Sequence, residues 1–325
     1  MSAPSSSTGW VDRCLRQFPQ PVVFFAARNQ GYAASLFRIC LGLIILLNGI
    51  RLLFNIERYY GESGAFPWAT VAGFPEHAIS LLRFAPTEPL FYTAICSIPL
   101  IAGLALTFGI FSRFHLFLFF LVMVSLRHRN PFLGNGGDHL LVILAFLGAF
   151  LPLDAHYSVA TRLREKWTSY SRPASYSVWA SRLIGLQLSY IYLYAFSSKV
   201  KYAAWWNGEA LRAALAAPEI SRWAGVLEPA GPLLSFAFLV GGVFTIAFEG
   251  LFPFFVWQKR SRLFAIAAGI LFHCGIELGL RITAFSWLMI SCYCLFLSDD
   301  QVIALMRLFR LEPRSKEAKP VPLSR

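Results

Sequence analysis

Two lysines follow a tyrosine-rich apolar segment in the middle of this sequence. Lys199 and Lys201 end the run YIYLYAFSSKVK, and two tryptophans and an Asn-Gly turn come next. A lysine at such an edge can extend its ammonium group to the lipid headgroups as an anchor. It can also lose hydration, which favours the neutral amine and lets the side chain act as a base. Both roles stay open; Lys199 is a candidate catalytic base, with Trp205 as a candidate substrate contact.

A second set of candidates is spaced along one predicted helix. His273, Glu277 and Arg281 recur every four residues in the apolar run 263–280, so they share one helix face. A histidine and a carboxylate on one face can move protons or bind a substrate, and the same residues can also form a ladder of internal ion pairs. We take Glu277 as a candidate acid or base and His273 as a candidate substrate contact.

The segment RNPFLGNGGDHLL (129–141) places polar side chains at the start of another apolar run. Its Asn-Gly-Gly turn predicts a helix start with Asp138 as the N-cap and His139 in the first turn. His139 is therefore a candidate acid or base, and Asp138 is a candidate substrate contact together with Tyr60 from the first loop. Capping alone for Asp138, and a hydrogen bond to a loop carbonyl for His139, are the alternatives that need no substrate.

Three ionisable residues lie deep within apolar sequence. They are Arg38, Arg182 and Glu249. A buried carboxylate requires a cation or strong hydrogen-bond donors, because the membrane interior does not solvate its charge. We therefore expect Glu249 to form a structural ion pair with Arg38 or Arg182.

The composition restricts the class of protein in which these residues act. Hydrophobic residues make up 57% of the 325 residues and charged residues only 14%, with a mean hydropathy of +0.56. Soluble domains contain about a quarter charged residues, so the composition predicts a polytopic membrane protein in contact with the lipid bilayer. The net charge of +12 belongs to loops and membrane surfaces. No nucleic-acid partner is expected, because no basic patch alternates with exposed aromatics, and no metal is expected, because the cysteines lack metal-binding spacing.

Eight apolar runs predict an all-α polytopic transmembrane helix bundle of about eight spans. Five runs have about the 20 residues that cross a bilayer, namely 33–55, 89–111, 179–198, 232–257 and 263–280. Three runs are shorter, namely 114–126, 139–153 and 284–298. Most of the 29 Lys and Arg residues fall on the same side as the N-terminus, so the positive-inside rule predicts cytoplasmic N- and C-termini.

On this topology, Lys199, His139 and Glu277 share the extracytoplasmic side, which favours one joint site. The expected organisation is a cytoplasmic N-terminal segment (1–30), a transmembrane domain (31–298) and a basic cytoplasmic tail (299–325). The start of that tail has the pattern of a short amphipathic helix.

Five segments of the sequence form a set with a fixed order. They are FRICLGLIILLNGI (37–50), YYGESGAFP (59–67), RNPFLGNGGDHLL (129–141), YAFSSKVKYAAWWNGEAL (194–211) and FSWLMI (285–290). Together they resemble the HTTM family, the transmembrane domain shared with the vitamin K-dependent gamma-glutamyl carboxylases. The resemblance implies a membrane bundle whose active site lies on the lumenal side. In the carboxylases, oxygenation of reduced vitamin K yields the base that removes a proton from a substrate glutamate. A reduced, vitamin K-like quinone is the cofactor that the resemblance implies.

The resemblance carries over to the candidate residues only in part. The carboxylase Asn-His pair is similar to Asp138–His139, so the histidine matches. The carboxylase Lys-Lys pair, whose second lysine is the catalytic base, falls on Lys199 and Val200, so a valine stands at the position of the base. The Tyr-Ser-Trp segment is similar to Phe285–Ser286–Trp287, which makes Trp287 a candidate substrate contact.

Two functions remain open at this level. The sequence ends in a short tail where the carboxylases have a long lumenal domain, so it resembles the short bacterial members and we expect a bacterial inner membrane protein. The first function is an enzyme that modifies a quinone-like or other lipid-soluble substrate at an extracytoplasmic site. The second is a non-catalytic bundle that binds a partner membrane protein, a redox partner or a secreted peptide, as in toxin maturation.

Overall fold

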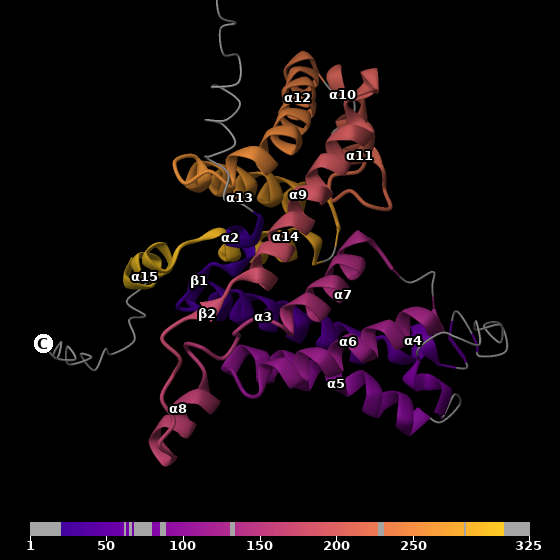
Figure 1. The fold of residues 1–325 in the computed structure, drawn as a ribbon. Helices are drawn as coiled ribbons and strands as arrows, with labels where there is room; N and C mark the ends of the chain where they lie inside the picture. The colour runs from indigo at the N-terminus through magenta and orange to yellow at the C-terminus, as the bar shows by residue number, and fades with distance from the viewer. Residues whose placement is uncertain are drawn as a thin grey trace, which may run out of the picture.

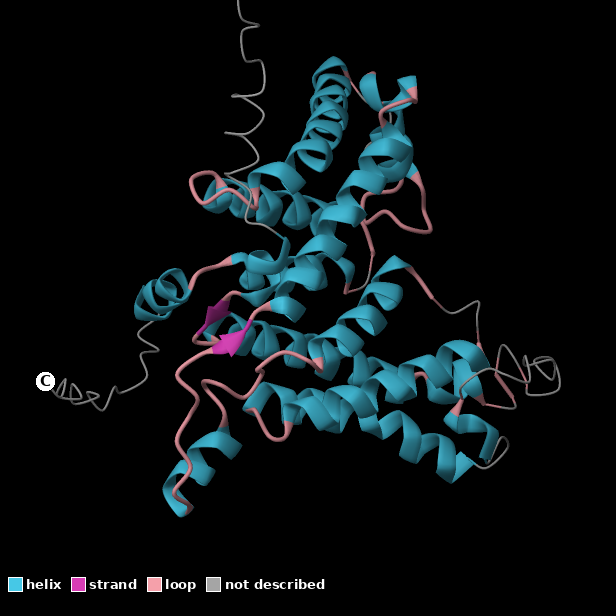
Figure 2. Ribbon diagram, viewed as in Figure 1, coloured by secondary structure: helices cyan, strands magenta, loops and turns pink. Residues whose placement is uncertain are grey.

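Long apolar helices form most of this structure, which is a computed structural model (Figure 1; Figure 2). It describes residues 21–61, 63–64, 67, 80–84, 89–130, 134–226, 231–282 and 284–308. In the first half of the chain the helices are α2 (Pro21–Ala26), α3 (Tyr32–Phe54), α4 (Ile56–Tyr60), α5 (Pro89–Phe108), α6 (Ser112–Arg129), α7 (Gly136–Gly148) and α8 (Val159–Trp167). In the second half they are α9 (Trp179–Lys199), α10 (Ala203–Trp206), α11 (Glu209–Ala216), α12 (Pro232–Phe255), α13 (Arg262–Gly279), α14 (Phe285–Tyr293) and α15 (Asp299–Leu308).

Short elements complete the described chain. Two 3-10 helices are η2 (Leu81–Phe84) and η3 (Cys294–Phe296). Strands β1 (Arg28–Asn29) and β2 (Tyr176–Ser177) pair antiparallel, with Arg28 opposite Ser177. This two-residue ladder joins the segment before α3 to the segment before α9.

A helix occupies each of the eight predicted apolar runs, so the prediction of a helical membrane protein is confirmed. Among the described helices, α3, α5, α12 and α13 are long and apolar enough to cross a membrane. The segment Phe285–Phe296 together with α15 would add a fifth span, although the two parts meet at a bend of 119°. The count of eight spans and the side on which the termini lie stay predictions.

Glycines allow α3 and α5 to pack closely along their length. A Cβ atom at Gly103 on α5 would lie 2.4 Å from the backbone nitrogen of Leu46 on α3. One at Gly49 on α3 would lie 2.6 Å from the backbone nitrogen of Leu100. In membranes such small residues let helix backbones approach, because van der Waals packing replaces the hydrophobic driving force. In Figure 1, α3, α5 and α6 form the lower part of the molecule, α9, α12 and α13 the upper part, and α14 lies between them.

The predicted amphipathic helix of the tail is present as α15 and packs on the start of α3. Val302 and Met306 are buried there beside Ala33. The Asp299 carboxylate accepts hydrogen bonds from the backbone nitrogens of Gln30, at 2.7 Å, and Tyr32, at 3.3 Å. Donors at the beginning of α3 are thereby satisfied by a side chain from the far end of the chain.

Arg38 and Arg182 connect segments of the chain through groups other than carboxylates. The Arg38 guanidinium is fully buried and donates to backbone carbonyls, including those of Leu106, Leu153 and Tyr157. The Arg182 guanidinium lies over the rings of Phe24 and Trp257, 4.7 and 5.5 Å from their centroids. Carbonyl oxygens and aromatic faces therefore stabilise these two charges.

Candidate functional site

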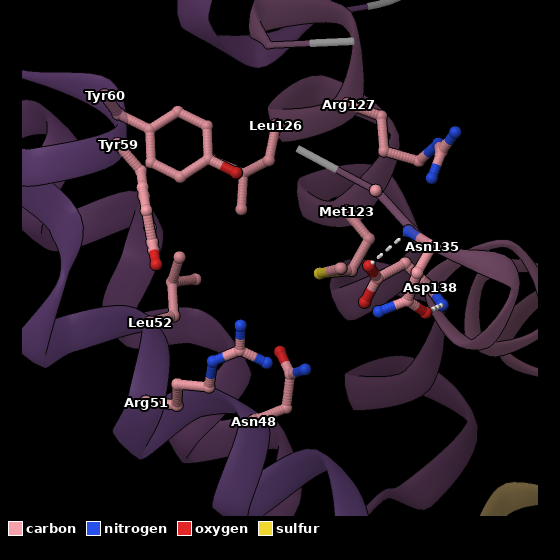
Figure 3. Close-up of a pocket in the computed structure, with 11 residues that line it drawn as sticks. Asn48, Arg51, Leu52, Tyr59, Tyr60, Met123, Leu126, Arg127, Asn135 and Asp138 are labelled. Carbon is pink, nitrogen blue, oxygen red and sulfur yellow. Dashed lines mark hydrogen bonds between the residues drawn. The ribbon is translucent and has the colours of Figure 1, made fainter. Parts of the chain in front are cut away.

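A polar cavity of about 290 Å³ lies where α3, α4, α6 and α7 meet (Figure 3). We call it the polar chamber. Its lining residues are Asn48, Arg51, Leu52, Tyr59, Tyr60, Met123, Leu126, Arg127, Gly134, Asn135 and Asp138. Two residues that the sequence singled out, Tyr60 and Asp138, thus face the same space from different helices.

The Tyr60 hydroxyl is positioned as a hydrogen-bond donor in the chamber. Figure 3 shows its oxygen pointing into the cavity, with the Arg51 side chain on the opposite side. Tyr60 is only 7% exposed, and burial, above all, raises the pKa of its hydroxyl. The backbone carbonyl of Tyr60 accepts a hydrogen bond from Arg129, 3.3 Å away, which fixes the end of α4. The hydroxyl therefore stays protonated at neutral pH and can donate to an oxygen in the chamber.

Asp138 is held by a capping box at the start of α7. The Asn135 side-chain oxygen accepts from the backbone nitrogens of Gly137, at 2.7 Å, and Asp138, at 3.2 Å. In return, the Asp138 carboxylate accepts from the backbone nitrogen of Asn135 at 3.0 Å. The prediction that Asp138 is the N-cap is wrong, because the helix starts earlier and Asn135 satisfies its first donors. The capping box orients the carboxylate, which faces the chamber.

His139 supports the chamber from outside. Its Nε2 atom lies 2.8 Å from Nη2 of Arg127, a residue that lines the chamber. A guanidinium can only donate, so Nε2 of His139 is the acceptor in this contact. The chamber lining within the described residues does not include His139. The histidine predicted as an acid or base thus contacts Arg127, one of the two arginines that line the chamber.

An apolar groove of about 810 Å³ runs between α3 and α14 next to the chamber. We call it the α3–α14 groove. Its apolar part and one end are lined by Cys40, Leu43, Ile44, Leu47, Ala284, Trp287, Ile290, Ser291 and Cys294. The other end is lined by Asn48, Arg51, Arg222, Glu277 and Arg281. Because Asn48 and Arg51 also line the polar chamber, the two cavities meet at these side chains.

Glu277 and Trp287, both singled out by the sequence, line this groove. The Glu277 Oε1 atom accepts from Nη2 of Arg222 at 3.0 Å, and Nε of Arg222 donates to the Glu277 backbone carbonyl at 2.8 Å. The carboxylate of Glu277 therefore belongs to an ion pair at the polar end of the groove. Trp287 is 51% exposed on the groove wall.

Lys199 lies in an ion pair between α9 and α12. Its Nζ atom is 2.9 and 3.0 Å from the two carboxylate oxygens of Glu249, and 5.2 Å from the ring centroid of Trp205. The side chain of Glu249 is 7% exposed and that of Lys199 is 20% exposed. Neither Lys199 nor Trp205 is among the described residues that line the chamber or the groove.

The expected pairing of Glu249 with Arg38 or Arg182 is therefore wrong. Two contacts set the axial alignment of the antiparallel helices α9 and α12. The Trp257 indole donates to the Ser189 hydroxyl at 3.0 Å, and a Cβ atom at Gly250 would lie 2.9 Å from the Phe196 ring. This alignment brings Glu249 to the level of the last turn of α9 and hence to the Lys199 ammonium group.

His273 lies in the core, away from the groove. Its Nε2 atom is 2.8 Å from the Tyr192 hydroxyl, which also bonds the Tyr293 hydroxyl. All three side chains are buried, and His273 is 1% exposed. The predicted stripe of His273, Glu277 and Arg281 is thus divided, since the last two residues line the groove while the first joins a chain of hydroxyl groups from α9 and α14.

Sequence reasoning missed Asn48 and Arg51, which join the two cavities. The signal was available, because two polar residues spaced by three lie near the end of a mostly apolar run and so share a helix face. Polar side chains in such a run mark a site in membrane proteins. Tyr192 and Tyr293 carried a weaker signal, since tyrosines in apolar runs are common packing residues.

A bundle of apolar, membrane-length helices with a polar chamber defines an integral membrane protein. A sequence model of the HTTM domain matches residues 28–300, and the chain belongs to the HTTM family. The predicted family membership is therefore confirmed over most of the chain. Comparison with curated proteins gave no match, and comparison with solved structures gave none.

Proposed function

We propose that this protein is a membrane enzyme that modifies the polar head of a lipid-soluble substrate. The observation that carries the proposal is the junction of the polar chamber with the α3–α14 groove at Asn48 and Arg51. A substrate with one polar and one apolar part would fill both cavities at once. Ligand sites of this kind combine an apolar lining with a few convergent polar groups.

Three side chains of the chamber have complementary roles in this proposal. Asp138 accepts a proton, because its carboxylate faces the cavity and is oriented by Asn135. Tyr60 donates a hydrogen bond to a substrate oxygen, and Arg51 stabilises negative charge that develops there. A reduced quinone, which the resemblance to the carboxylases implies, is the alternative occupant; it would present its ring oxygens to these donors and would supply redox chemistry when bound.

The proposed site excludes Lys199, which the sequence alone suggested as a base. Its ammonium group is held by the Glu249 carboxylate. Within the described residues, neither the chamber lining nor the groove lining includes Lys199, so its side chain does not contact a substrate held there. Glu277, paired with Arg222, and His139, bonded to Arg127, become positioning residues in the same proposal.

A second function is a non-catalytic bundle that binds a membrane or peptide partner. The observation that favours it is the position of Val200, where the resemblance to the carboxylases implies the catalytic base. Under this alternative the chamber would be a packing defect or a partner site, and substitutions in it would leave lipid composition unchanged.

The proposed enzyme has eight spans, both termini in the cytoplasm and a chamber that opens to the extracytoplasmic side of a bacterial inner membrane. The helices in all eight apolar runs and the distribution of Lys and Arg support this arrangement. It would expose the chamber to extracytoplasmic substrates and to lipids of the outer leaflet.

The test compares membranes that carry the wild-type protein with membranes that carry conservative chamber variants. Asp138→Asn keeps an acceptor for the capping box and removes the base, and Tyr60→Phe keeps the ring and removes the donor. Tyr170→Phe is the matched control, because the half-buried Tyr170 ring lies against Arg164 of α8 and is not part of the chamber lining. Lipids and quinones are extracted and profiled by mass spectrometry.

We expect a product that wild-type and Tyr170→Phe membranes contain and that Asp138→Asn and Tyr60→Phe membranes lack, at equal amounts of folded protein. Profiles that are identical for all four proteins and for membranes without the protein would reject the enzyme. That outcome would leave the non-catalytic function as the better account.

A further inference from the structure

Positive charge predominates at the polar end of the α3–α14 groove. Arg51, Arg222 and Arg281 line this end, and Glu277 is the carboxylate beside them. Arg222 pairs with Glu277 at 3.0 Å. In the part of the chain that the structure describes, neither Arg51 nor Arg281 forms a salt bridge. Two guanidinium groups are therefore available to an anion at this end.

The rest of the groove is apolar and as long as one leaflet of a bilayer. On α3 the lining extends from Cys40 to Arg51, and at 1.5 Å per residue this is about 16 Å. The hydrocarbon core of a bilayer is about 30 Å thick, so one leaflet accounts for about 15 Å. A single acyl chain can lie along the groove while its headgroup reaches the arginines.

The groove is open to the bilayer from the side. Leu47 is 67% exposed and Trp287 is 51% exposed on its walls. Exposed apolar side chains on a membrane-spanning bundle face lipid tails. A lipid can therefore enter laterally from the bilayer, without passing through water.

We infer that the α3–α14 groove binds a phospholipid with an anionic phosphate headgroup, its acyl chain along α3 and α14 and its phosphate between Arg51 and Arg281. This inference rests on the proposed function, since it names the substrate class of that site. Guanidinium groups bind phosphate oxygens through two parallel hydrogen bonds, which favours arginine at phosphate sites.

Charge also determines which lipids the groove rejects. A neutral isoprenoid quinone would fill the apolar part and leave both guanidinium groups without an anion. A zwitterionic lipid would bring its own ammonium group close to Arg51 and Arg281, and the like charges would repel. Lipid tails contact apolar surface equally well in the groove and in the bilayer, so the headgroup alone supplies the selectivity.

The test uses Trp287 as a reporter of groove occupancy. The purified full-length protein is placed in phosphatidylcholine nanodiscs, and phosphatidylglycerol with brominated acyl chains replaces the host lipid stepwise. Bromine quenches tryptophan fluorescence at contact. The difference in fluorescence between wild type and the Trp287→Phe variant gives the signal of Trp287, and hence of the groove, without the other tryptophans. Brominated phosphatidylcholine, titrated in the same way, measures quenching by bulk lipid.

We expect half-maximal quenching of Trp287 at a mole fraction of phosphatidylglycerol roughly tenfold below that of phosphatidylcholine, because charge-assisted hydrogen bonds discriminate by about that factor. The Arg51→Gln/Arg281→Gln double variant should lose the preference. Lys201→Gln is the matched control, since it removes an exposed charge that follows α9 and lies outside the groove lining.

Equal quenching by the two lipids, or a preference that survives in the double variant, would overturn the inference. Displacement of phosphatidylglycerol by a neutral quinone at a lower mole fraction would also overturn it, by assigning the groove to the quinone. The Asp138→Asn variant separates this result from the proposed function. Asp138→Asn can bind phosphatidylglycerol like wild type and also give the same lipid profile as wild-type membranes. That result would contradict the proposed enzyme and would leave the lipid-binding site supported.

Discussion

Removal of the Lys199 amine should destabilise the protein, because it leaves a buried carboxylate without its cation. Nζ of Lys199 contacts both oxygens of Glu249, at 2.9 and 3.0 Å, and the Glu249 side chain is only 7% exposed. Lys199→Ala therefore leaves a carboxylate with little access to water and with no ion-pair partner among the described residues. The pair joins α9 to α12, so the loss affects the packing of two long helices.

The magnitude follows from the burial of the two partners. Breaking a buried ion pair by removing one partner costs about 3–5 kcal/mol. The Lys199 side chain is 20% exposed, which admits some water and favours the lower end, about 3 kcal/mol. Replacing both partners by uncharged residues of similar size, as in Lys199→Met/Glu249→Gln, should be nearly neutral, because no charge remains buried.

The assay is unfolding of the purified protein in mixed micelles, followed for wild type, Lys199→Ala, Lys199→Met, Glu249→Gln and the double variant Lys199→Met/Glu249→Gln. A double-mutant cycle then gives the coupling free energy between the two side chains. The reasoning is refuted if Lys199→Ala unfolds within about 0.5 kcal/mol of wild type. In that case the ion pair contributes no stability, and a loss of activity in Lys199→Ala would reassign the lysine to catalysis.

Three further predictions concern packing, pH and topology. Gly103→Ala should lower the free energy of unfolding by about 1–3 kcal/mol, since its Cβ would lie 2.4 Å from the Leu46 backbone, whereas Gly275→Ala, in open space, should not. Burial lowers the pKa of His156 below its usual range. The stability that the neutral imidazole contributes is therefore present above about pH 6.5 and is lost as the pH falls through the lowered pKa of the folded protein. Melting temperatures measured between pH 5 and 8 should fall more steeply at low pH for wild type than for His156→Gln. A reporter fused after Trp223 should be extracytoplasmic, and a cytoplasmic signal there would contradict the proposed topology.

The helices of this protein were predictable because they depend on local sequence. A backbone inside a bilayer must satisfy its own hydrogen bonds, so each long apolar run forms a helix whatever its neighbours are. The tail helix at Asp299–Leu308 followed from its apolar periodicity in the same way. The start of α7 was placed three residues late, because Asn135 and Asp138 are both good capping residues and only the backbone distinguishes them.

The site was predictable only as a set of residue types. Tyr60 and Asp138 do meet in one chamber, and Glu277 and Trp287 do line the neighbouring groove. Lys199, by contrast, shares a predicted membrane side with these residues but contacts Glu249 in a different part of the bundle. A topology assigns depth along the membrane normal and leaves open which helices are neighbours.

The sequence by itself determined that this chain is a helical membrane protein of the HTTM family and which polar side chains its helices carry. The tertiary structure decided which of those side chains meet. The partner of Glu249 depends on the axial alignment of α9 and α12, which the contact of Gly250 with Phe196 sets. The junction of chamber and groove depends on the rotation of α3, which turns Asn48 and Arg51 toward both cavities. Alignment and rotation result from side-chain packing between segments far apart in the chain, and no local pattern encodes them.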